Sequence, residues 1–129
     1  WTMFRDPKQS SVLVVTLPEE LPTTESLELI DSVQNELGLP IGEVVVNGII
    51  PPLFSEAERE QLLAKDAVLG DEPGEQAIAA AARRSVRERV QAASLKRLSQ
   101  LPFRQIRLPY LFEGAGRPEA VAQLSRFFG

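Results

Sequence analysis

Residues 43–52, EVVVNGIIPP, decide how the rest of the chain can fold. A run of valines ends at Asn47-Gly48, a second apolar pair follows, and Pro51-Pro52 then stops it. One interpretation is a hairpin turn, because Asn-Gly pairs favour the tight turns of hairpins. The other is that Asn47 stands at the carboxyl end of a buried strand, where open α/β sheets bind their ligands.

The segment before this stretch favours the second interpretation. Residues 12–17 predict a strand, because the continuous apolar run at residues 12–15 is typical of a strand covered on both faces. A helix is predicted after Pro22, capped by Thr23 or Thr24 and ended at Gly38. Strand, helix and strand in this order predict two parallel strands joined by a right-handed crossover. The double proline also blocks the returning strand that a hairpin needs. The predicted helix buries Leu27, Ile30, Val33 and Leu37.

Helices and one more strand are predicted beyond the double proline. Residues 55–69 look helical, with Ser55 as N-cap and Glu58 at the capping-box position. An Ala- and Arg-rich stretch over residues 75–99 is the strongest helix signal in the chain. Its expected apolar stripe contains Ile78, Ala82, Val86, Val90 and Ala93.

The last part of the chain completes a three-layer α/β pattern. Residues 104–108 predict a third strand, which alternates more than the others and is therefore expected nearer an edge. A short helix follows, with Pro118 in its first turn. The order β-α-β-α-α-β-α predicts one α/β/α domain over residues 1–129 with a mainly parallel sheet.

Composition limits the chemistry that this chain can perform. Its 129 residues are 43% hydrophobic and 25% charged, as in ordinary soluble domains. A net charge of −4 gives no basic footprint for a nucleic-acid partner. There is no Cys and no His, which excludes thiol catalysis, Ser-His triads, disulfides and the usual zinc sites. A carboxylate-bound Mg²⁺ stays open.

The sequence also bears on the cellular compartment and on whether the chain is part of a longer protein. It contains no run of 18 apolar residues and no signal-peptide pattern, so the cytoplasm is the expected compartment. The start WTMFRDPKQSS lacks an initial Met and is rich in bulky residues that normally need packing partners. A segment of a longer protein is therefore expected.

Three strand ends supply the candidate binding residues. Residues 16–18, 46–48 and 108–110 should meet at one edge of a parallel sheet. Asn47 offers two donors and one acceptor, which suit the edge of a nucleobase. From spacing alone, a turn residue with a satisfied side chain is the favoured alternative. Pro109 and Tyr110 could form an apolar shelf for a ring, or the proline could simply end the strand.

Other motifs are weaker. The cations of the helix over 75–99 could face an acidic partner, but a solvated face with an Arg84–Glu88 pair is favoured. Gly114–Gly116 is a faint phosphate-loop signal, and the chain has no P-loop motif. Neither Glu19-Glu20 nor Asp71-Glu72 is positioned as an acid–base couple, so no catalytic residue and no metal ligand is predicted. The cations of the predicted helix over 75–99 are Arg83, Arg84, Arg87, Arg89, Lys96 and Arg97.

Four segments in order make the chain resemble a known family. They are DPKQSSVLVVTLPEELPTTESLELI (6–30), IGEVVVNGIIPP (41–52), the long charged helix, and IRLPYLFEGAGRPEAVAQLSRFF (106–128). Together they resemble the C-terminal third of the anion-transporting ATPases, the dimeric P-loop proteins that include arsenite pumps and tail-anchored-protein-targeting ATPases. The resemblance implies a P-loop NTPase-like fold that lacks its P-loop here.

The resemblance assigns roles to the strand ends. Asn47 matches an asparagine that hydrogen-bonds adenine, and Pro109 matches a proline that lines the adenine pocket. Glu25 matches a glutamate at the start of a helix, without a specific role. The implied adenine-binding residues are Asn47, Pro109, Tyr110, Leu111 and Phe112.

The resemblance also implies partners and cofactors. The intact ATPase would hydrolyse ATP with Mg²⁺ in a homodimer or paralogue dimer, using an N-terminal P-loop part that this chain lacks, and a membrane-protein partner is left open. Phosphate positioning belongs to that part, so this chain alone is expected to be inactive and to bind nucleotide weakly. The alternative hypothesis is a non-catalytic interaction module that uses the Arg-rich helix over 75–99.

The chain departs from the family at several points. Gly48 stands where the family has Gln or Arg, and Arg117 lies one position out of register with the family's Glu-Val/Ile-Arg-Gly motif. The zinc-binding cysteine pair of the eukaryotic members is absent, as in many bacterial ones. The chain therefore resembles the bacterial type.

Overall fold

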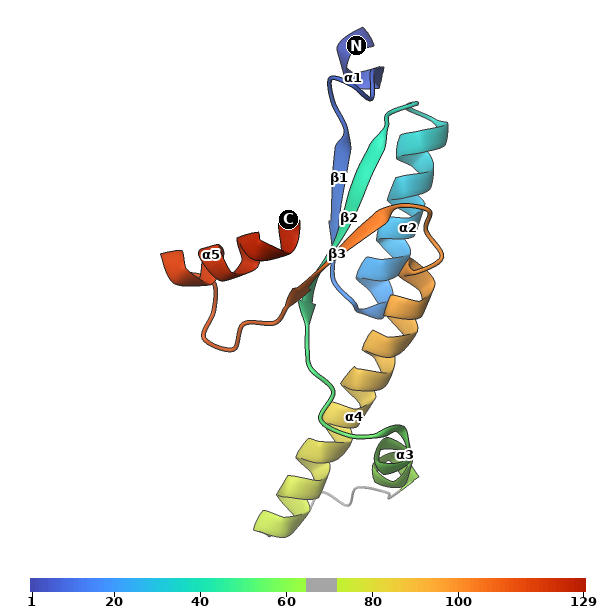
Figure 1. Ribbon diagram of the computed structural model, residues 1–129. Coiled ribbons are helices and arrows are strands. Elements are labelled where there is room, and N and C mark those ends of the chain that lie inside the picture. The colour runs from blue at the N-terminus through green and yellow to red at the C-terminus, as the bar shows by residue number, and fades with distance from the viewer. Residues whose placement is uncertain (65–71) are drawn as a thin grey trace.

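The sheet is the centre of the molecule. A computed structural model describes residues 1–64 and 72–129 and shows a mixed α/β fold (Figure 1). Its sheet has three strands, all parallel, with β2 (Ile41–Ile49) between β1 (Val12–Thr16) and β3 (Arg104–Pro109). The prediction of parallel strands is confirmed, and β3 lies at an edge as expected.

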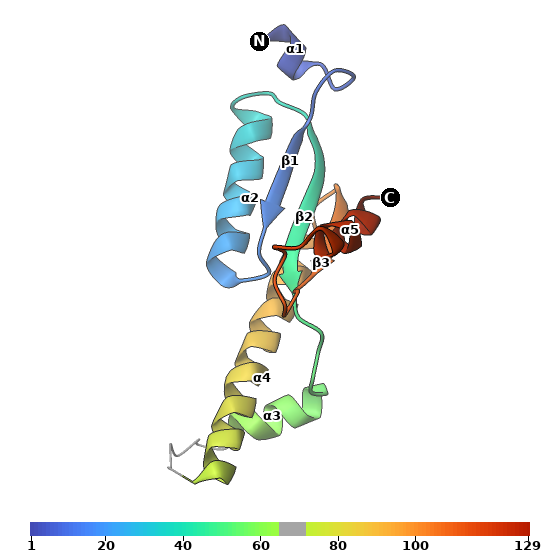
Figure 2. The ribbon, with the colours of Figure 1, turned by 90° about the vertical axis from the view of Figure 1, so that its left-hand side faces the viewer.

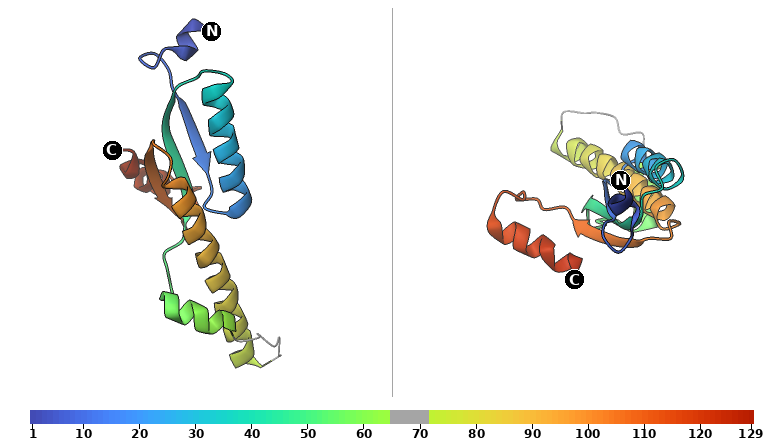
Figure 3. Two further views of the ribbon diagram at one scale, coloured as in Figure 1. Left: turned by 90° about the vertical axis from the view of Figure 1, so that its right-hand side faces the viewer. Right: turned by 90° about the horizontal axis from the view of Figure 1, so that it is seen from above.

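Helices lie on both faces of the sheet, as the predicted three-layer arrangement requires. Two long helices cover one face, and a short C-terminal helix lies on the other (Figures 1 and 3). One of the long helices extends far beyond the sheet and carries a shorter helix beside its distant end (Figure 2). In chain order the described helices are α1 (Thr2–Arg5), α2 (Glu20–Asn35), α3 (Glu56–Ala64), α4 (Pro73–Leu98), α5 (Pro118–Ser125) and the 3₁₀ helix η1 (Arg126–Phe128).

Local signals fix the helix ends with small differences from prediction. Helix α2 begins three residues before Thr23, because Pro22 fits in a first turn, where no N–H is needed. At α3 the capping box is confirmed: the Ser55 N–H donates to Glu58 at 2.7 Å, and the Glu58 N–H donates to the Ser55 hydroxyl at 3.3 Å. The predicted continuation over 65–69 lies outside the described residues.

The main core lies between the sheet and the two long helices. Val44 and Val46 of β2 and Leu98 of α4 are fully buried there, and Val14 and Ile30 join them. Burying such side chains stabilises the fold by about 1.5–3 kcal/mol each. The face of α2 predicted from its periodicity is therefore confirmed at Ile30 and Val33, whereas Leu37 lies beyond the end of the helix and is 42% exposed.

The opposite face is only half covered, which corrects the prediction for residues 12–17. Val45 of β2 is buried on this side with Ile106 and Leu108, and Leu124 of α5 packs against them. On β1, however, Leu13 and Val15 are 50% and 59% exposed. The apolar run of β1 is thus buried on one face only, because α5 and η1 lie over β3 rather than over β1 (Figure 3).

The buried face of α4 also differs from the predicted stripe. Ile78 and Val86 are 40% and 41% exposed, and Ala93 is exposed as well. The side of the helix that faces the rest of the molecule is mostly polar. The prediction was wrong because α4 crosses a stretch of irregular backbone whose polar groups need polar partners. The buried residues of α4 are Ala79, Ser85, Glu88, Gln91, Ser94 and Leu98.

Candidate functional site

The carboxyl ends of the strands form one edge of the sheet, as the parallel topology demands. Ile49 pairs with Pro109 across β2 and β3, and the Tyr110 N–H donates to the Ile49 carbonyl at 2.8 Å. This pairing brings two of the segments singled out in the sequence, 46–48 and 108–110, onto neighbouring strands. The hairpin interpretation of Asn47-Gly48 is excluded, since β2 runs on through both residues in a parallel sheet.

Asn47 lies at this edge with its side chain exposed. It follows three buried valines, and its amide makes no hydrogen bond with any residue that the structure describes. The register of β2 against β3 shifts between Val46 and Ile49, and Gly48 has a φ of +76° within that shift. A positive φ favours glycine, so the bulge accounts for the Asn-Gly pair without a turn.

Tyr110 forms the side of the edge that faces α4. The Arg87 guanidinium lies 5.7 Å from the centre of its ring, and Phe112 meets the ring edge-on at 5.0 Å between centroids. A side chain added at Gly48 would contact Leu17 and Tyr110. The Tyr110 ring is thus held beside the end of β2 by the Arg87 guanidinium, the Phe112 ring and the nearby backbone of Gly48.

The predicted site residues do not share one cavity. A mainly apolar pocket of about 340 Å³ at the carboxyl ends of β2 and β3 includes Pro109, Tyr110 and Phe112. A second pocket, of about 560 Å³, lies between Tyr110–Gly114 and the start of α5 and includes Leu111. Asn47 lines neither. It joins the others through strand pairing and through its neighbour Gly48, not through a common cavity.

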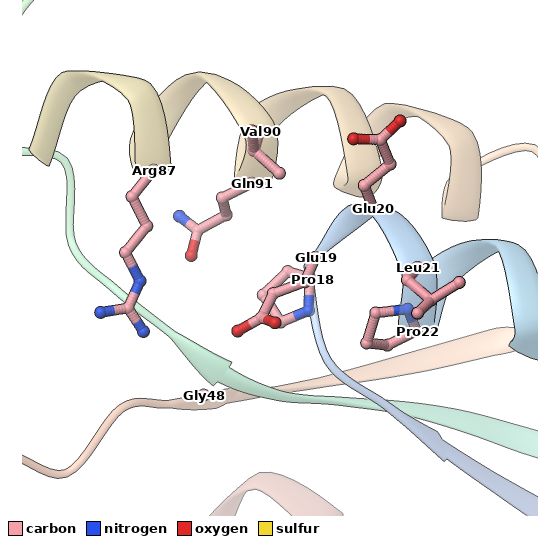
Figure 4. Close-up of a pocket in the computed structure, with 9 residues that line it drawn as sticks. All are labelled: Pro18, Glu19, Glu20, Leu21, Pro22, Gly48, Arg87, Val90 and Gln91. Carbon is pink, nitrogen blue, oxygen red and sulfur yellow. The ribbon is translucent and has the colours of Figure 1, made fainter. Parts of the chain in front are cut away.

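A third pocket, of about 370 Å³, lies where β1, β2 and α4 approach one another (Figure 4). The β1–α2 turn forms one wall with Pro18, Glu19, Glu20, Leu21 and Pro22, and Gly48 forms the floor. Side chains of α4 form the remaining wall, namely Arg87, Val90 and Gln91. We call it the carboxyl-edge pocket.

Two charged groups of the carboxyl-edge pocket form no ion pair with any described residue. Glu19 and Arg87 both point into the space above Gly48, yet they form no ion pair (Figure 4). The carboxylate of Glu20 points away from that space (Figure 4). From the sequence, Glu19 is predicted in a loop and Arg87 on a solvated helix face. Only the crossing of α4 over the strand ends brings them together.

Gln91 and Glu88 fix α4 against the chain that leaves β2. The Gln91 amide accepts from the Ile50 N–H and donates to the Ile50 carbonyl, both at 2.9 Å, as a neighbouring strand would. Glu88 accepts from the Leu53 N–H at 2.8 Å and from Arg84 Nε at 2.8 Å. These contacts hold α4 at the height where Arg87 reaches the sheet edge.

The environment of Glu88 controls its ionisation. Its side chain is 2% exposed, and burial by itself raises the pKa. Hydrogen bonds from Arg84, from the Leu53 and Phe54 amides and from Arg59 outweigh burial, so the pKa of Glu88 lies below the ordinary carboxyl value. The predicted Arg84–Glu88 pair is confirmed, but it is buried and structural rather than a feature of a solvated face.

Metal sites and membrane-spanning helices are two further features that bear on function. Among residues 1–64 and 72–129, no three His, Cys, Asp or Glu side chains lie together as metal ligands would. No helix among them is both long enough and apolar enough to cross a membrane. Asp71, half of one acidic pair considered in the sequence, lies outside the described residues. Glu19 and Glu20, the other pair, point in different directions (Figure 4).

Comparison of the chain with models of known protein families and with curated proteins gave no match.

Proposed function

We propose that the chain recognises the base of an adenine nucleotide at the carboxyl edge of its sheet. The chain would be the C-terminal part of an ATPase similar to the anion-transporting ATPases. The observation that carries this proposal is the exposed amide of Asn47, which has no hydrogen-bond partner within residues 1–64 and 72–129 and lies on the strand next to Pro109 and Tyr110. Sequence resemblance supports the same residues.

The chemistry of these groups fits adenine. An asparagine amide has a donor and an acceptor in one plane, matching the adjacent acceptor and donor of the adenine edge. Guanine presents a different pattern, which gives a basis for selectivity. The Tyr110 ring and Pro109 supply an apolar surface for the flat base, and stacking on an aromatic ring contributes about 1–3 kcal/mol per base.

Phosphate chemistry would come from elsewhere. The P-loop and the groups that hold Mg²⁺ are absent from this sequence, and phosphoryl transfer depends on such groups for positioning. ATP hydrolysis, dimerisation with a copy or a paralogue, and any contact with a membrane protein are therefore proposed for an intact ATPase. This chain alone should bind nucleotide weakly and not hydrolyse it.

The alternative proposal is an interaction module that binds an acidic partner through the Arg-rich helix. Fewer cations of this helix are free than the sequence suggested. Arg84 bonds to Glu88 and to the Pro51 carbonyl, Arg97 donates to the Thr24 hydroxyl, and Arg87 lies on Tyr110. An acidic partner would have to use the cations that remain. Because hydrogen bonds within the chain engage Arg84 and Arg97, nucleotide recognition is the better-supported proposal.

Asn47→Ala tests base recognition. Wild-type chain should bind ATP more tightly than GTP, and Asn47→Ala should weaken ATP binding by about tenfold, because one bidentate contact contributes about 1–3 kcal/mol. Isothermal titration calorimetry at millimolar nucleotide would measure both affinities.

Asn35→Ala is the matched control, since Asn35 lies at the far end of α2 and its amide donates to Asp31. It should leave both affinities unchanged. Equal affinity for ATP and GTP in the wild type, or an Asn47→Ala variant that binds as well as wild type, would contradict the proposal.

A further inference from the structure

We propose that the carboxyl-edge pocket binds the ribose of the nucleotide, with Glu19 accepting hydrogen bonds from the 2′- and 3′-hydroxyls. The inference rests on the proposed adenine recognition and extends it from the base to the sugar. It assigns a ligand to a pocket that the base-binding residues leave open.

The location of the pocket fits a sugar attached to the bound base. Gly48, on its floor, directly follows Asn47 in β2. Arg87, in its wall, is the same side chain that lies over the Tyr110 ring. The pocket therefore lies one residue along β2 from Asn47 and reaches Tyr110 through Arg87, on the α4 side of the sheet edge. The volume of about 370 Å³ is in the range of small-ligand sites.

The polar groups of the pocket suit a pair of hydroxyls. A hydroxyl both donates and accepts, so a vicinal diol can donate to a carboxylate and accept from a guanidinium at once. Glu19 and Arg87 offer these two partners from opposite walls, and they do not satisfy each other (Figure 4). Gln91 is engaged with Ile50 and keeps the α4 wall in place.

The charge of the pocket favours the sugar over the phosphates. The charged groups that point into its space are the Glu19 carboxylate and the Arg87 guanidinium, since the Glu20 carboxylate points away (Figure 4). A phosphate group placed beside Glu19 would be repelled by its carboxylate, whereas a neutral diol donates a charge-assisted hydrogen bond to it. A carboxylate that receives ribose hydroxyls is a recognised arrangement in dinucleotide-binding sheets.

The position of Glu19 is fixed by its backbone, and its carboxylate takes no part in capping α2. Glu19 is the N-cap residue of α2, and its carbonyl accepts from the Thr23 N–H at 3.0 Å. Its side chain makes no capping hydrogen bond. Replacing the carboxylate by an amide of the same shape should therefore leave the helix intact and change only what the pocket accepts.

The test compares adenosine with 2′-deoxyadenosine, so that no phosphate contributes. Wild-type chain should prefer adenosine by about fivefold, because 2′-deoxyadenosine loses one hydrogen bond to a charged group, and such a bond contributes less in an open pocket than in a buried site. Glu19→Gln should reduce the ratio of the two affinities to near one. Arg87→Gln, a second variant, should lower the ratio as well.

Two controls separate this inference from base recognition. Glu28→Gln, an exposed carboxylate of α2 that does not line the pocket, should keep the wild-type ratio. Asn47→Ala should weaken binding of both nucleosides equally and also keep the ratio, since it acts on the base.

The outcomes are distinct. If adenosine binds through Asn47 but Glu19→Gln and Arg87→Gln both keep the wild-type ratio, ribose recognition is overturned and base recognition stands. If the wild-type chain binds neither nucleoside, both proposals fall. A drop in the ratio for Glu19→Gln, with an unchanged thermal unfolding midpoint, supports the inference.

Discussion

The molecule has two regions that are held together in different ways. The body consists of the sheet, α2 and the last turns of α4, and its contacts are apolar, with Val44, Val46 and Leu98 fully buried. The arm consists of residues 50–55, α3 and the first part of α4, and it extends beyond the sheet (Figures 1 and 2). Helix α3 buries no residue completely.

In the arm, Ile50 and Ala79 are buried, and polar contacts add much of what holds the segment to α4. Glu88 accepts from the Leu53 and Phe54 amides and from Arg84 and Arg59, while Arg59 also donates to the Phe54 carbonyl. A hydrophobic contact depends mainly on area, whereas these bonds depend on each partner being present. In the body, the loss of stability on substitution should therefore scale with the apolar volume removed. In the arm, removing a single hydrogen-bond acceptor should be enough to loosen the local structure.

The largest effect is expected in the body. Leu98→Ala should reduce the free energy of unfolding by about 2–5 kcal/mol, because it leaves a cavity at a fully buried position. Leu13→Ala is the matched control: its side chain is 50% exposed on the open face of β1, so the loss should stay below about 1 kcal/mol. Urea denaturation followed by circular dichroism would measure both, and equal losses would show that the open face is covered in solution.

The next effect is expected in the arm. Glu88→Gln should destabilise by about 2 kcal/mol, because an amide cannot accept from Arg84, Arg59 and two backbone N–H groups as a carboxylate does. Hydrogen exchange should quicken at the Leu53 and Phe54 amides and change little at Val45 in the body.

Glu75→Gln, an exposed change in the first turn of α4, is the control for the arm. Exchange that quickens equally at Val45 and at Leu53 in the Glu88 variant would erase the distinction between the two regions.

The smallest effect concerns pH. The pKa of Glu88 is lowered in the folded chain, so its stabilising contribution is complete above the unfolded value of about 4.3 and is lost as pH falls through the folded pKa. Between about pH 6 and pH 4 only the start of this loss is reached. Denaturation at several pH values should show a steeper acid decline for wild type than for Glu88→Gln, and identical slopes would contradict the role of Glu88.

Much of the fold follows from the sequence because it depends on local pattern. The order of elements, the parallel sheet and the capping box of α3 come from periodicity, chain length and hydrogen bonds between near neighbours. The position of Asn47 at the carboxyl end of β2 was predicted in the same way. Those features need no knowledge of what lies across the molecule.

The tertiary structure alone decided which faces are buried. The sequence favoured an apolar stripe through Ile78 and Val86 on α4, yet the helix turns Glu88 and Gln91 inward, because the chain leaving β2 presents backbone groups that need hydrogen bonds. The prediction that β1 is buried on both faces was wrong for a related reason, since no described segment covers its second face. The carboxyl-edge pocket likewise joins Glu19 and Arg87 from distant segments. A sequence determines which surfaces can be buried, but only the packed chain determines which neighbour is present to bury them.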